Sequence, residues 1–266
     1  MRDLNITVVQ SNLFWEDIKS NLSLFDKKID SIREKTDLIV LPEMFTTGFS
    51  MNAKKLAREM GSASVEWLKN KSCSKQVDIT GSMIIKEDGK YFNRLLWAKP
   101  DGKLLYYDKK HLFRMTGEER VYSEGNNNLT VELNGWKIRP FVCYDLRFPC
   151  WTRNFNKAYD VAVFVANWPE ARSYHWETLL LARAIENQCY VVGVNRVGKD
   201  GNGYNHIGNS SIVDPAGNIL FRKQDEECIY TATLSYSVLE EYRKSFPAWM
   251  DADSNEYQIL NKEFCD

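Results

Sequence analysis

Apolar residues in the first half of the chain follow one helical repeat and several short strand-like runs. Ile18, Leu22, Phe25, Ile29 and Ile32 recur at steps of 4, 3, 4 and 3 residues, a period that predicts an amphipathic helix. A second helical pattern covers residues 64–71. Compact apolar runs bounded by turn residues predict strands at residues 5–10, 37–42, 79–85, 95–98 and 104–107.

The second half of the chain continues this alternation of strands and helices. Strand-like runs lie at residues 129–133, 137–142, 161–166, 190–194, 211–213, 219–221 and 230–234. A helix is predicted over residues 174–187, with Leu179, Leu180, Ala184 and Ile185 on its buried side. Residues 109–128 are interpreted as polar and irregular, and residues 198–208 as a glycine-rich loop. Strands that alternate with helices in both halves predict an α/β fold with mixed sheets covered by helices.

The pattern indicates one continuous domain. It contains no low-complexity linker and no repeat, so residues 1–266 are expected to form a single unit with a core over residues 4–234. The tail, residues 238–266, is charged but carries the aromatic side chains of Tyr242, Phe246, Trp249 and Tyr257. Because a lone chain exposing that much aromatic surface is prone to associate, we expect the tail to lie at a subunit interface.

Charge and cysteine usage narrow the possible functions. Lys plus Arg number 35 and Asp plus Glu 36, a formal net charge of -1, so the chain lacks the basic field typical of nucleic-acid or membrane-surface binding. The sequence has no apolar run of about 18 residues, and the segment from Met1 to Gln10 resembles a strand and not a signal peptide. The 6 cysteines include no C-x-x-C pair, which favours free thiols. We therefore expect a cytoplasmic protein with no nucleic-acid or membrane partner.

The motifs of several common enzyme classes are missing. The sequence contains no G-x-S-x-G elbow, no P-loop, no G-x-G-x-x-G and no H-E-x-x-H. The 3 histidines, His111, His175 and His206, show no metal-ligand spacing, so no metal site is expected.

Three reactive side chains each follow an apolar strand directly. Glu43 follows residues 38–42, Lys109 follows residues 104–108, and Cys143 follows residues 139–142. Because open α/β sheets place ligands at the carboxyl ends of their strands, we expect these side chains to lie together. A carboxylate can take the proton of a thiol, and an ammonium can lower the pKa of that thiol and stabilise an oxyanion. The resulting thioester is hydrolysed by water without a metal or cofactor.

Each residue also has an ordinary structural interpretation. A cysteine at the end of a buried strand is usually a small core residue, a glutamate after a proline is often a cap, and a lysine beside another lysine is usually solvated. Only the joint placement of the three favours catalysis. A thiol hydrolase that uses His111 or His175, and a non-catalytic scaffold, remain open at this point.

Three sequence blocks resemble the signature motifs of the carbon–nitrogen hydrolases, the nitrilase superfamily. The blocks are Leu41-Pro-Glu-Met-Phe45, Tyr107-Asp-Lys-Lys-His-Leu-Phe113 and Val142-Cys-Tyr-Asp-Leu-Arg-Phe-Pro149. Their order and spacing match, and the likeness extends from Ile6 to about Leu234. It implies a four-layer-forming α-β-β-α sandwich and assembly into a homodimer or a larger homo-oligomer.

The resemblance also implies roles for individual residues. Glu43 corresponds to the general base, Lys109 to the oxyanion-stabilising cation and Cys143 to the nucleophile, with the backbone N–H of Tyr144 completing the oxyanion hole. Many members carry a second glutamate after the lysine, a position that Glu118 or Glu119 fills here; we favour Glu118.

Further segments, such as Phe45-Thr-Thr-Gly-Phe49 and Phe246-Pro-Ala-Trp249, resemble the bacterial omega-amidases within this superfamily. That likeness implies hydrolysis of the terminal amide of a short dicarboxylic monoamide, such as 2-oxoglutaramate or succinamate, to the acid and ammonia. A substrate carboxylate requires a cation, for which we favour Arg172, with Trp168 lining the pocket; Arg147 is interpreted as a structural ion-pair former. A nitrilase, an N-carbamoyl amidohydrolase and another aliphatic amidase remain alternatives.

Overall fold

The computed structural model describes residues 1–252, which form two β-sheets. The first sheet has 6 strands in the order β13-β1-β2-β3-β4-β5, and the second has 7, in the order β10-β11-β9-β8-β7-β6 with β12 paired to β11. The strands of the first sheet are β1 (Leu4–Gln10), β2 (Leu38–Val40), β3 (Asp78–Glu87), β4 (Lys90–Ala98), β5 (Leu104–Asp108) and β13 (Cys228–Leu234). Those of the second are β6 (Val131–Leu133), β7 (Trp136–Val142), β8 (Val161–Val165), β9 (Tyr190–Val194), β10 (Val197–Lys199), β11 (Asn205–Val213) and β12 (Ile219–Gln224).

The connections carry long helices and short helical turns. The α-helices are α1 (Ile18–Ser31), α2 (Ala53–Leu56), α3 (Ala63–Lys75), α4 (Glu118–Val121), α5 (Pro149–Thr152), α6 (Ser173–Asn187) and α7 (Tyr236–Ser245). The 3₁₀ turns are η1 (Arg114–Thr116), η2 (Cys143–Arg147), η3 (Phe155–Lys157), η4 (Glu170–Arg172) and η5 (Ala248–Asp251). Among residues 1–252, no helix is both long enough and apolar enough to cross a membrane.

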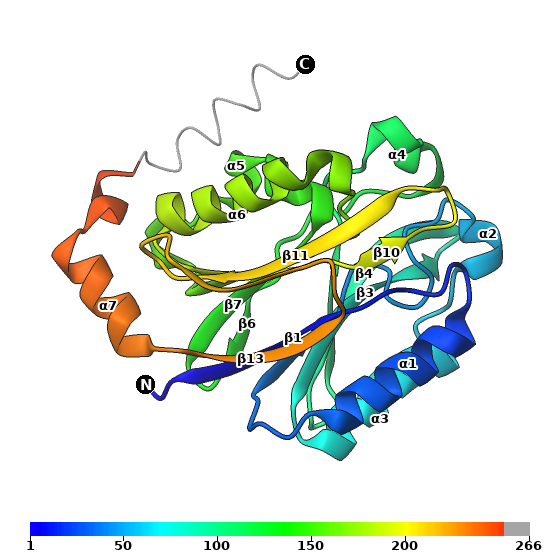
Figure 1. Cartoon of the computed structure of the whole chain (residues 1–266), viewed down its shortest axis with the longest axis horizontal. Helices are drawn as coiled ribbons and strands as arrows, with labels where there is room; N and C mark the ends of the chain where they lie inside the picture. Colours follow the sequence, from blue (N-terminus) through cyan, green and yellow to red (C-terminus); the bar gives the residue numbers. More distant parts are fainter. Residues whose placement is uncertain (253–266) are drawn as a thin grey trace.

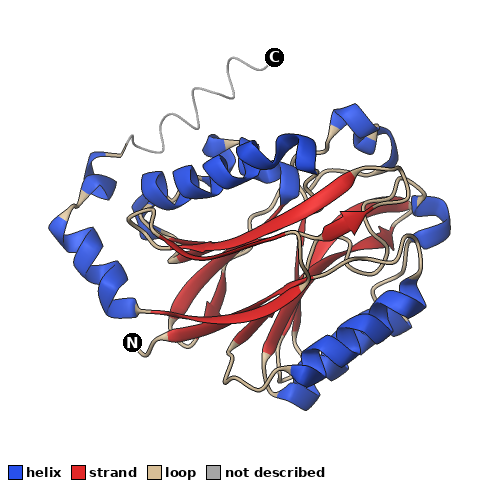
Figure 2. Cartoon of the chain, viewed as in Figure 1, coloured by secondary structure: helices blue, strands red, loops and turns tan. Residues whose placement is uncertain are grey.

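Buried apolar clusters define the layers of the molecule. One cluster, which includes Val40 and Val163, fills the space between the two sheets. A second packs α1 and α3 on the first sheet through Phe25 and Leu68, and a third packs α6 on the second sheet through Leu180. Figure 1 shows α1 and α3 together on one side of the sheets and α6 on the other, and Figure 2 shows the strands enclosed between helices. The predicted α-β-β-α sandwich of mixed sheets is confirmed.

Strand direction places several strand ends at one edge of the sandwich. β1, β2 and β3 run parallel, and β4 and β5 return by antiparallel pairing, so β5 ends on the same side as β2. β7, β8 and β9 also run parallel. A hydrogen bond from Asn167, just after β8, to Glu43, just after β2, shows that these ends of the two sheets meet.

The sequence pattern located most regular elements but was wrong in several segments. The predicted glycine-rich loop 198–208 is largely an antiparallel hairpin, because β10 pairs with β11 and leaves residues 200–204 as its turn. The interval 109–128 is not wholly irregular, since it contains η1 and α4. On α6, Leu180 and Ala184 are buried as predicted, but Ile185 is 51% exposed, because it lies beyond the stripe that faces the sheet.

The start of the predicted tail is a helix packed on the same chain. Leu239 of α7 joins the core between the sheets. The Arg243 guanidinium donates to Asp160 at 2.7 Å and to the Gln188 carbonyl at 2.9 Å. Phe246 stays exposed. Tyr257 and the rest of the interval 253–266 lie outside the described residues, so the expected subunit interface there remains a prediction.

Candidate active site

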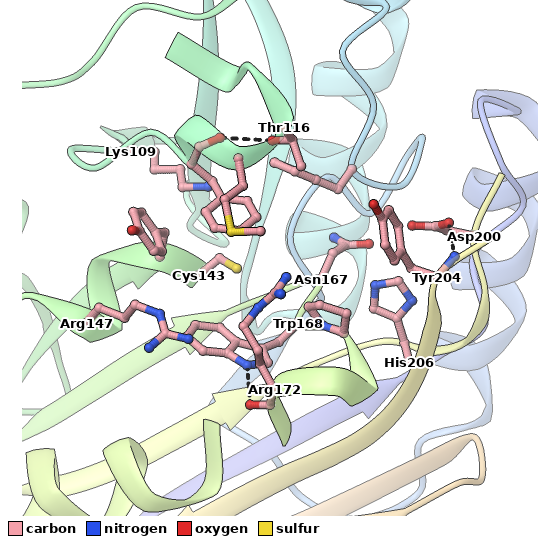
Figure 3. Close-up of a pocket in the computed structure, with 15 residues that line it drawn as sticks. Lys109, Thr116, Cys143, Arg147, Asn167, Trp168, Arg172, Asp200, Tyr204 and His206 are labelled. Atoms are coloured by element: carbon pink, nitrogen blue, oxygen red, sulfur yellow. Dashed lines mark hydrogen bonds between the residues drawn. The ribbon is translucent and has the colours of Figure 1, made fainter. Parts of the chain in front are cut away.

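The structure brings Glu43, Lys109 and Cys143 to the strand ends where the sequence placed them. Lys109 follows β5 and Cys143 follows β7 directly, while Glu43 lies three residues after the end of β2. Lys109 and Cys143 both line a cavity of about 130 Å³, into which their side chains point in Figure 3.

Lys109 lies at the centre of a buried charge cluster. Its Nζ donates to Glu43 Oε1 at 3.1 Å and to the two carboxylate oxygens of Glu118 at 3.0 and 2.9 Å. The side chains of all three residues are at most 1% exposed. The ring of Phe49 covers the ammonium, with Nζ 5.0 Å from its centroid, a favourable cation–π contact. One ammonium and two carboxylates leave a net negative charge when all three groups are ionised.

Glu43 is fixed by donors from both sheets. Besides Lys109, its Oε1 accepts a hydrogen bond from Nδ2 of Asn93 on β4 at 2.8 Å. Its Oε2 accepts one from the backbone N–H of Asn167 at 2.8 Å. With three donors on a fully buried carboxylate, the position of Glu43 is set by the protein before any substrate arrives.

Cys143 begins the η2 turn in a strained backbone conformation. Its φ is 45°, in the left-handed region that non-glycine residues rarely adopt. The buried carboxylate of Asp145 holds this turn by accepting from the Val142 N–H at 3.0 Å and the Tyr107 hydroxyl at 2.7 Å. It also accepts from the His111 N–H at 2.9 Å. Asp145 therefore joins the nucleophile turn to residues on either side of Lys109.

The thiol is held in its protonated form at rest. Burial raises the pKa of Cys143 well above its usual value, and the charge of Glu43, with a hydrogen bond between the thiol and that carboxylate, adds to the rise. Lys109 lowers the thiol pKa, as the sequence argument predicted, but burial and Glu43 outweigh it. Burial lowers the pKa of Lys109, but the carboxylates of Glu118 and Glu43 more than offset this, so its net pKa is raised. The site consequently needs a base that takes the thiol proton during attack.

The structure distinguishes the two candidate second glutamates. Glu118 is fully buried, contacts Lys109 with both oxygens and accepts from the Phe113 N–H at 2.6 Å. Burial raises the pKa of Glu118, opposed by the charge of Lys109 and reinforced by that of Glu43. Glu119 instead points to Arg120, 3.4 Å away. Only Glu118 joins the cluster around Lys109.

The rest of the cavity is lined mainly by aromatic side chains and by two arginines, together with one carboxylate, that of Asp200. Tyr144, Trp168 and Arg172 line it, as expected for substrate-binding residues, and Arg147 lines it too. The Arg172 guanidinium lies 5.3 Å from the centroid of Phe113, and that of Arg147 lies 4.8 Å from Trp168. Burial lowers the pKa of Arg147, and the charge of Arg172 lowers it further. The two guanidinium groups therefore act on each other, and both lie near Trp168 (Figure 3).

The interpretation of Arg147 as a structural ion-pair former finds no support within residues 1–252. Within residues 1–252, neither Arg147 nor Arg172 has a carboxylate at ion-pair distance. Arg147 instead bonds Nδ1 of His175 at 2.9 Å.

A cysteine–histidine pair receives no support from the geometry. The Nδ1 atom of His111 contacts Asp145 at 2.9 Å, and its ring stacks on Phe148 at 3.7 Å between centroids. The Nδ1 atom of His175 is hydrogen-bonded to the Arg147 guanidinium. His206 lines the cavity, where burial and the charge of Arg196 lower its pKa to about 4. Over residues 1–252, no cluster of three or more His, Cys, Asp and Glu side chains is arranged to hold a metal.

Sequence reasoning missed Asn93, Asp145 and His206. Asn93 and Arg94 lie between the apolar residues Phe92 and Leu95. Polar residues inside an otherwise buried strand are the signal that would have drawn attention to Asn93. Asp145 and His206 have no comparable local signal, because Asp145 joins the turn to the distant residues Tyr107 and His111 and His206 becomes buried only when distant segments pack around it.

Comparisons with known proteins identify the family of the chain. Residues 5–244 match the carbon–nitrogen hydrolase family. The chain is 48% identical over 254 residues to the omega-amidase YafV of Yersinia enterocolitica, covering 95% of this chain and 98% of that protein. It is 33% identical over 256 residues to the 2-oxoglutaramate amidase of Bacillus subtilis (strain 168), with coverage of 95% and 98%. The structure of XC1258 from Xanthomonas campestris, a CN-hydrolase superfamily protein, has a TM-score of 0.94 and 44% identity, covering 96% of this chain and 98% of that one.

Proposed function

This chain belongs to the carbon–nitrogen hydrolase family, and from that membership we propose that it is a cysteine-dependent omega-amidase. Its substrates are short dicarboxylic monoamides of the 2-oxoglutaramate and succinamate type, hydrolysed to the acid and ammonia. One observation carries the proposal. The Cys143 thiol, next to the Glu43–Lys109–Glu118 cluster, shares a small cavity with two guanidinium groups that have no carboxylate partner within residues 1–252.

Acylation begins with a proton transfer. Glu43 removes the proton from Cys143 as Sγ forms a bond to the amide carbon, which suits a thiol that is protonated at rest. The carbonyl oxygen becomes an oxyanion, which the Lys109 ammonium and the Tyr144 N–H stabilise. The C–N bond then breaks, Glu43 returns its proton to the leaving nitrogen, and ammonia departs from a thioester.

Deacylation uses the same groups again, with water as the nucleophile and Sγ as the leaving group. Glu43 takes a proton from water as the water oxygen attacks the thioester carbon, and Lys109 again stabilises the oxyanion. The C–S bond breaks, the proton passes to Sγ, and the acid is released. In this scheme Glu118 holds the Lys109 ammonium in place through both steps.

Recognition of the far carboxylate is assigned to Arg172. A guanidinium binds a carboxylate with two parallel hydrogen bonds, and a neutral analogue leaves that charge without a partner. Arg172 comes just before α6, at the same sheet end as Cys143, because β7 and β8 run parallel. Trp168 supports it by donating from Nε1 to the Arg172 carbonyl at 2.8 Å.

A substrate panel tests this function. Purified protein is incubated with 2-oxoglutaramate, succinamate, butyramide, an aliphatic nitrile and an N-carbamoyl amino acid, and ammonia is measured by a coupled assay. We expect rapid release from the first two substrates only. Ammonia from the nitrile or the carbamoyl compound but not from 2-oxoglutaramate would assign another branch of the family. Without ammonia from any compound and without an acyl adduct on Cys143 by mass spectrometry, the chain would be a scaffold.

We further propose a cytoplasmic homodimer. The exposed Phe246 and Met250, at 58% and 67% exposure, lie beside α7 and supply apolar area for a partner copy. Light scattering should give twice the chain mass at micromolar concentration, and a monomer would contradict the proposal. Cell fractionation should recover the protein with cytoplasmic markers.

A further inference from the structure

A single amide joins the two glutamates of the active site. Nδ2 of Asn93 donates to Glu43 Oε1 at 2.8 Å and lies 3.4 Å from Glu118 Oε1. The backbone of the same residue fixes the cation, because the Asn93 carbonyl accepts from the Lys109 N–H at 3.0 Å. Asn93 is fully buried on β4, so water cannot replace its contacts.

The orientation of this amide is imposed by a neighbouring strand. Ser82 of β3 donates from Oγ to Asn93 Oδ1 at 2.8 Å, which directs the NH₂ group of Asn93 toward the carboxylates. Ser82 Oγ also accepts from the Met44 N–H at 2.8 Å, and Met44 follows Glu43. The pair thus fixes both the side chain of Glu43 and the backbone next to it.

The electrostatic setting explains why such a donor is needed. Around Glu43, the ionisable neighbours are Lys109 at the end of β5, Glu118 on α4, Cys143 on η2 and Tyr122 just after α4. Of these, only Lys109 carries a positive charge, and Glu118 competes for it. Two buried carboxylates that share one ammonium repel each other, so a further hydrogen-bond donor to Glu43 offsets part of that repulsion.

We infer that Asn93 is a positioning residue, whose hydrogen bond stabilises the Glu43 carboxylate and fixes it beside Cys143 while Glu118 shares the same ammonium. A neutral donor achieves this without adding charge, because a hydrogen bond to a carboxylate stabilises its ionised form. This inference rests on the proposed role of Glu43 as the base. It concerns the protonation of that base and not the identity of the amide.

Alkylation of Cys143 tests the inference without any substrate. The rate at which iodoacetamide labels the Cys143 peptide is followed by mass spectrometry across the acid and neutral pH range. On the acid side of this profile the labelling rate falls as the pH drops, and this part of the profile is called the acid limb. In Asn93→Ala, the acid limb should lie about 1 pH unit or more higher than in wild type, the size expected for losing one hydrogen bond to a charged group. Ser82→Ala, which frees the amide to rotate, should move it in the same direction by less.

Asn154 provides the matched control. It is also a buried asparagine whose Nδ2 donates twice, to the carbonyls of Tyr159 and Asn187, and whose Oδ1 accepts from the Tyr159 N–H. Asn154→Ala should lower thermal stability comparably and leave the acid limb unchanged. An unmoved acid limb in a folded Asn93→Ala, or an equal shift in Asn154→Ala, would overturn the inference. If Asn93→Ala does not fold, an unmoved limb in Ser82→Ala has the same meaning.

The experiment separates this inference from the proposed function. Wild-type protein that releases no ammonia from 2-oxoglutaramate would refute the omega-amidase assignment, whereas the labelling profile would still report on Asn93. Conversely, active wild type with identical labelling profiles in the asparagine variants would refute the positioning role alone.

Discussion

The two ends of the active-site cavity are organised in opposite ways. The reactive end consists of Glu43, Lys109 and Glu118 below Cys143, and each of these three charged groups is hydrogen-bonded by the protein. The end that we propose for substrate recognition, called the recognition end, consists of Arg147, Arg172 and His206. There, the guanidinium groups have no carboxylate partner among residues 1–252, and the buried Nδ1 of His206 has no hydrogen-bond partner in that part of the chain.

This difference indicates a division of tasks. A reactive end whose groups are already paired has little reorganisation left to undergo when charge develops on the substrate. In the proposed function, the cations of the recognition end bind the substrate carboxylate, so a ligand without that carboxylate leaves them without a partner and binds less well. Changes at the reactive end should therefore reduce turnover of every substrate, and changes at the recognition end should alter the preference among substrates.

Replacing the nucleophile at the reactive end should have the largest effect on activity. Cys143→Ala is expected to abolish ammonia release while the unfolding temperature stays near that of wild type, because one sulfur at a strand end is lost. Cys150→Ala, at an exposed cysteine of the following helix α5, serves as the control and should remain active. If Cys143→Ala remained active and the Cys150 or Cys189 variant did not, the nucleophile would be that other cysteine.

Removing the base should have the next largest effect. Glu43→Gln preserves shape but cannot accept a proton, so both acylation and deacylation should slow by at least ~100-fold. Single-turnover kinetics with rapid quenching separate the two steps. Glu119→Gln, which alters a glutamate outside the cluster, should leave both rates near wild type. A loss confined to one step would mean that another group supplies the proton transfer in the other.

At the recognition end, Arg172→Met should change specificity more than chemistry. We expect kcat/KM for 2-oxoglutaramate to fall by an amount equivalent to about 2–4 kcal/mol of transition-state stabilisation, the range for removing one partner of a buried charge pair. The change for butyramide should be much smaller. Arg147→Met, measured in parallel, shows whether the second guanidinium shares the task. An equal loss of kcat/KM on both amides would mean that Arg172 supports its loop and does not bind the substrate carboxylate.

His206, at the recognition end, should make the stability of the fold sensitive to acid. Its pKa is lowered to about 4 by burial and by Arg196, whereas an unfolded histidine titrates near 6.5. The unfolded state therefore binds more protons between these values, and the free energy of unfolding falls as the pH drops from about 6.5 toward 4. Urea unfolding should show about 2 kcal/mol more loss between about pH 7 and pH 5 in wild type than in His206→Gln. Parallel losses in both proteins would assign the acid sensitivity to other groups.

The regular elements were predictable where the apolar period is strong. The repeat from Ile18 to Ile32 yields α1, which ends at Ser31, and the buried runs at residues 161–166 and 190–194 yield β8 and β9. The prediction failed at β10 and at the start of β11, because these glycine-containing segments become strands only by pairing with each other. Helix α7 was missed because Leu239 and Arg243 find their partners in distant parts of the chain.

The sequence by itself determined the layer architecture, the family likeness and the three strand ends that carry Glu43, Lys109 and Cys143, because these follow from local periodicity and from short contiguous motifs. Tertiary structure alone decided which of two adjacent glutamates meets Lys109, that Arg147 faces the cavity without a carboxylate partner among residues 1–252, and that Asn93 lies between two carboxylates. The physical reason is that burial, charge pairing and hydrogen-bond geometry are set by segments distant in sequence, which meet only when the two sheets pack together.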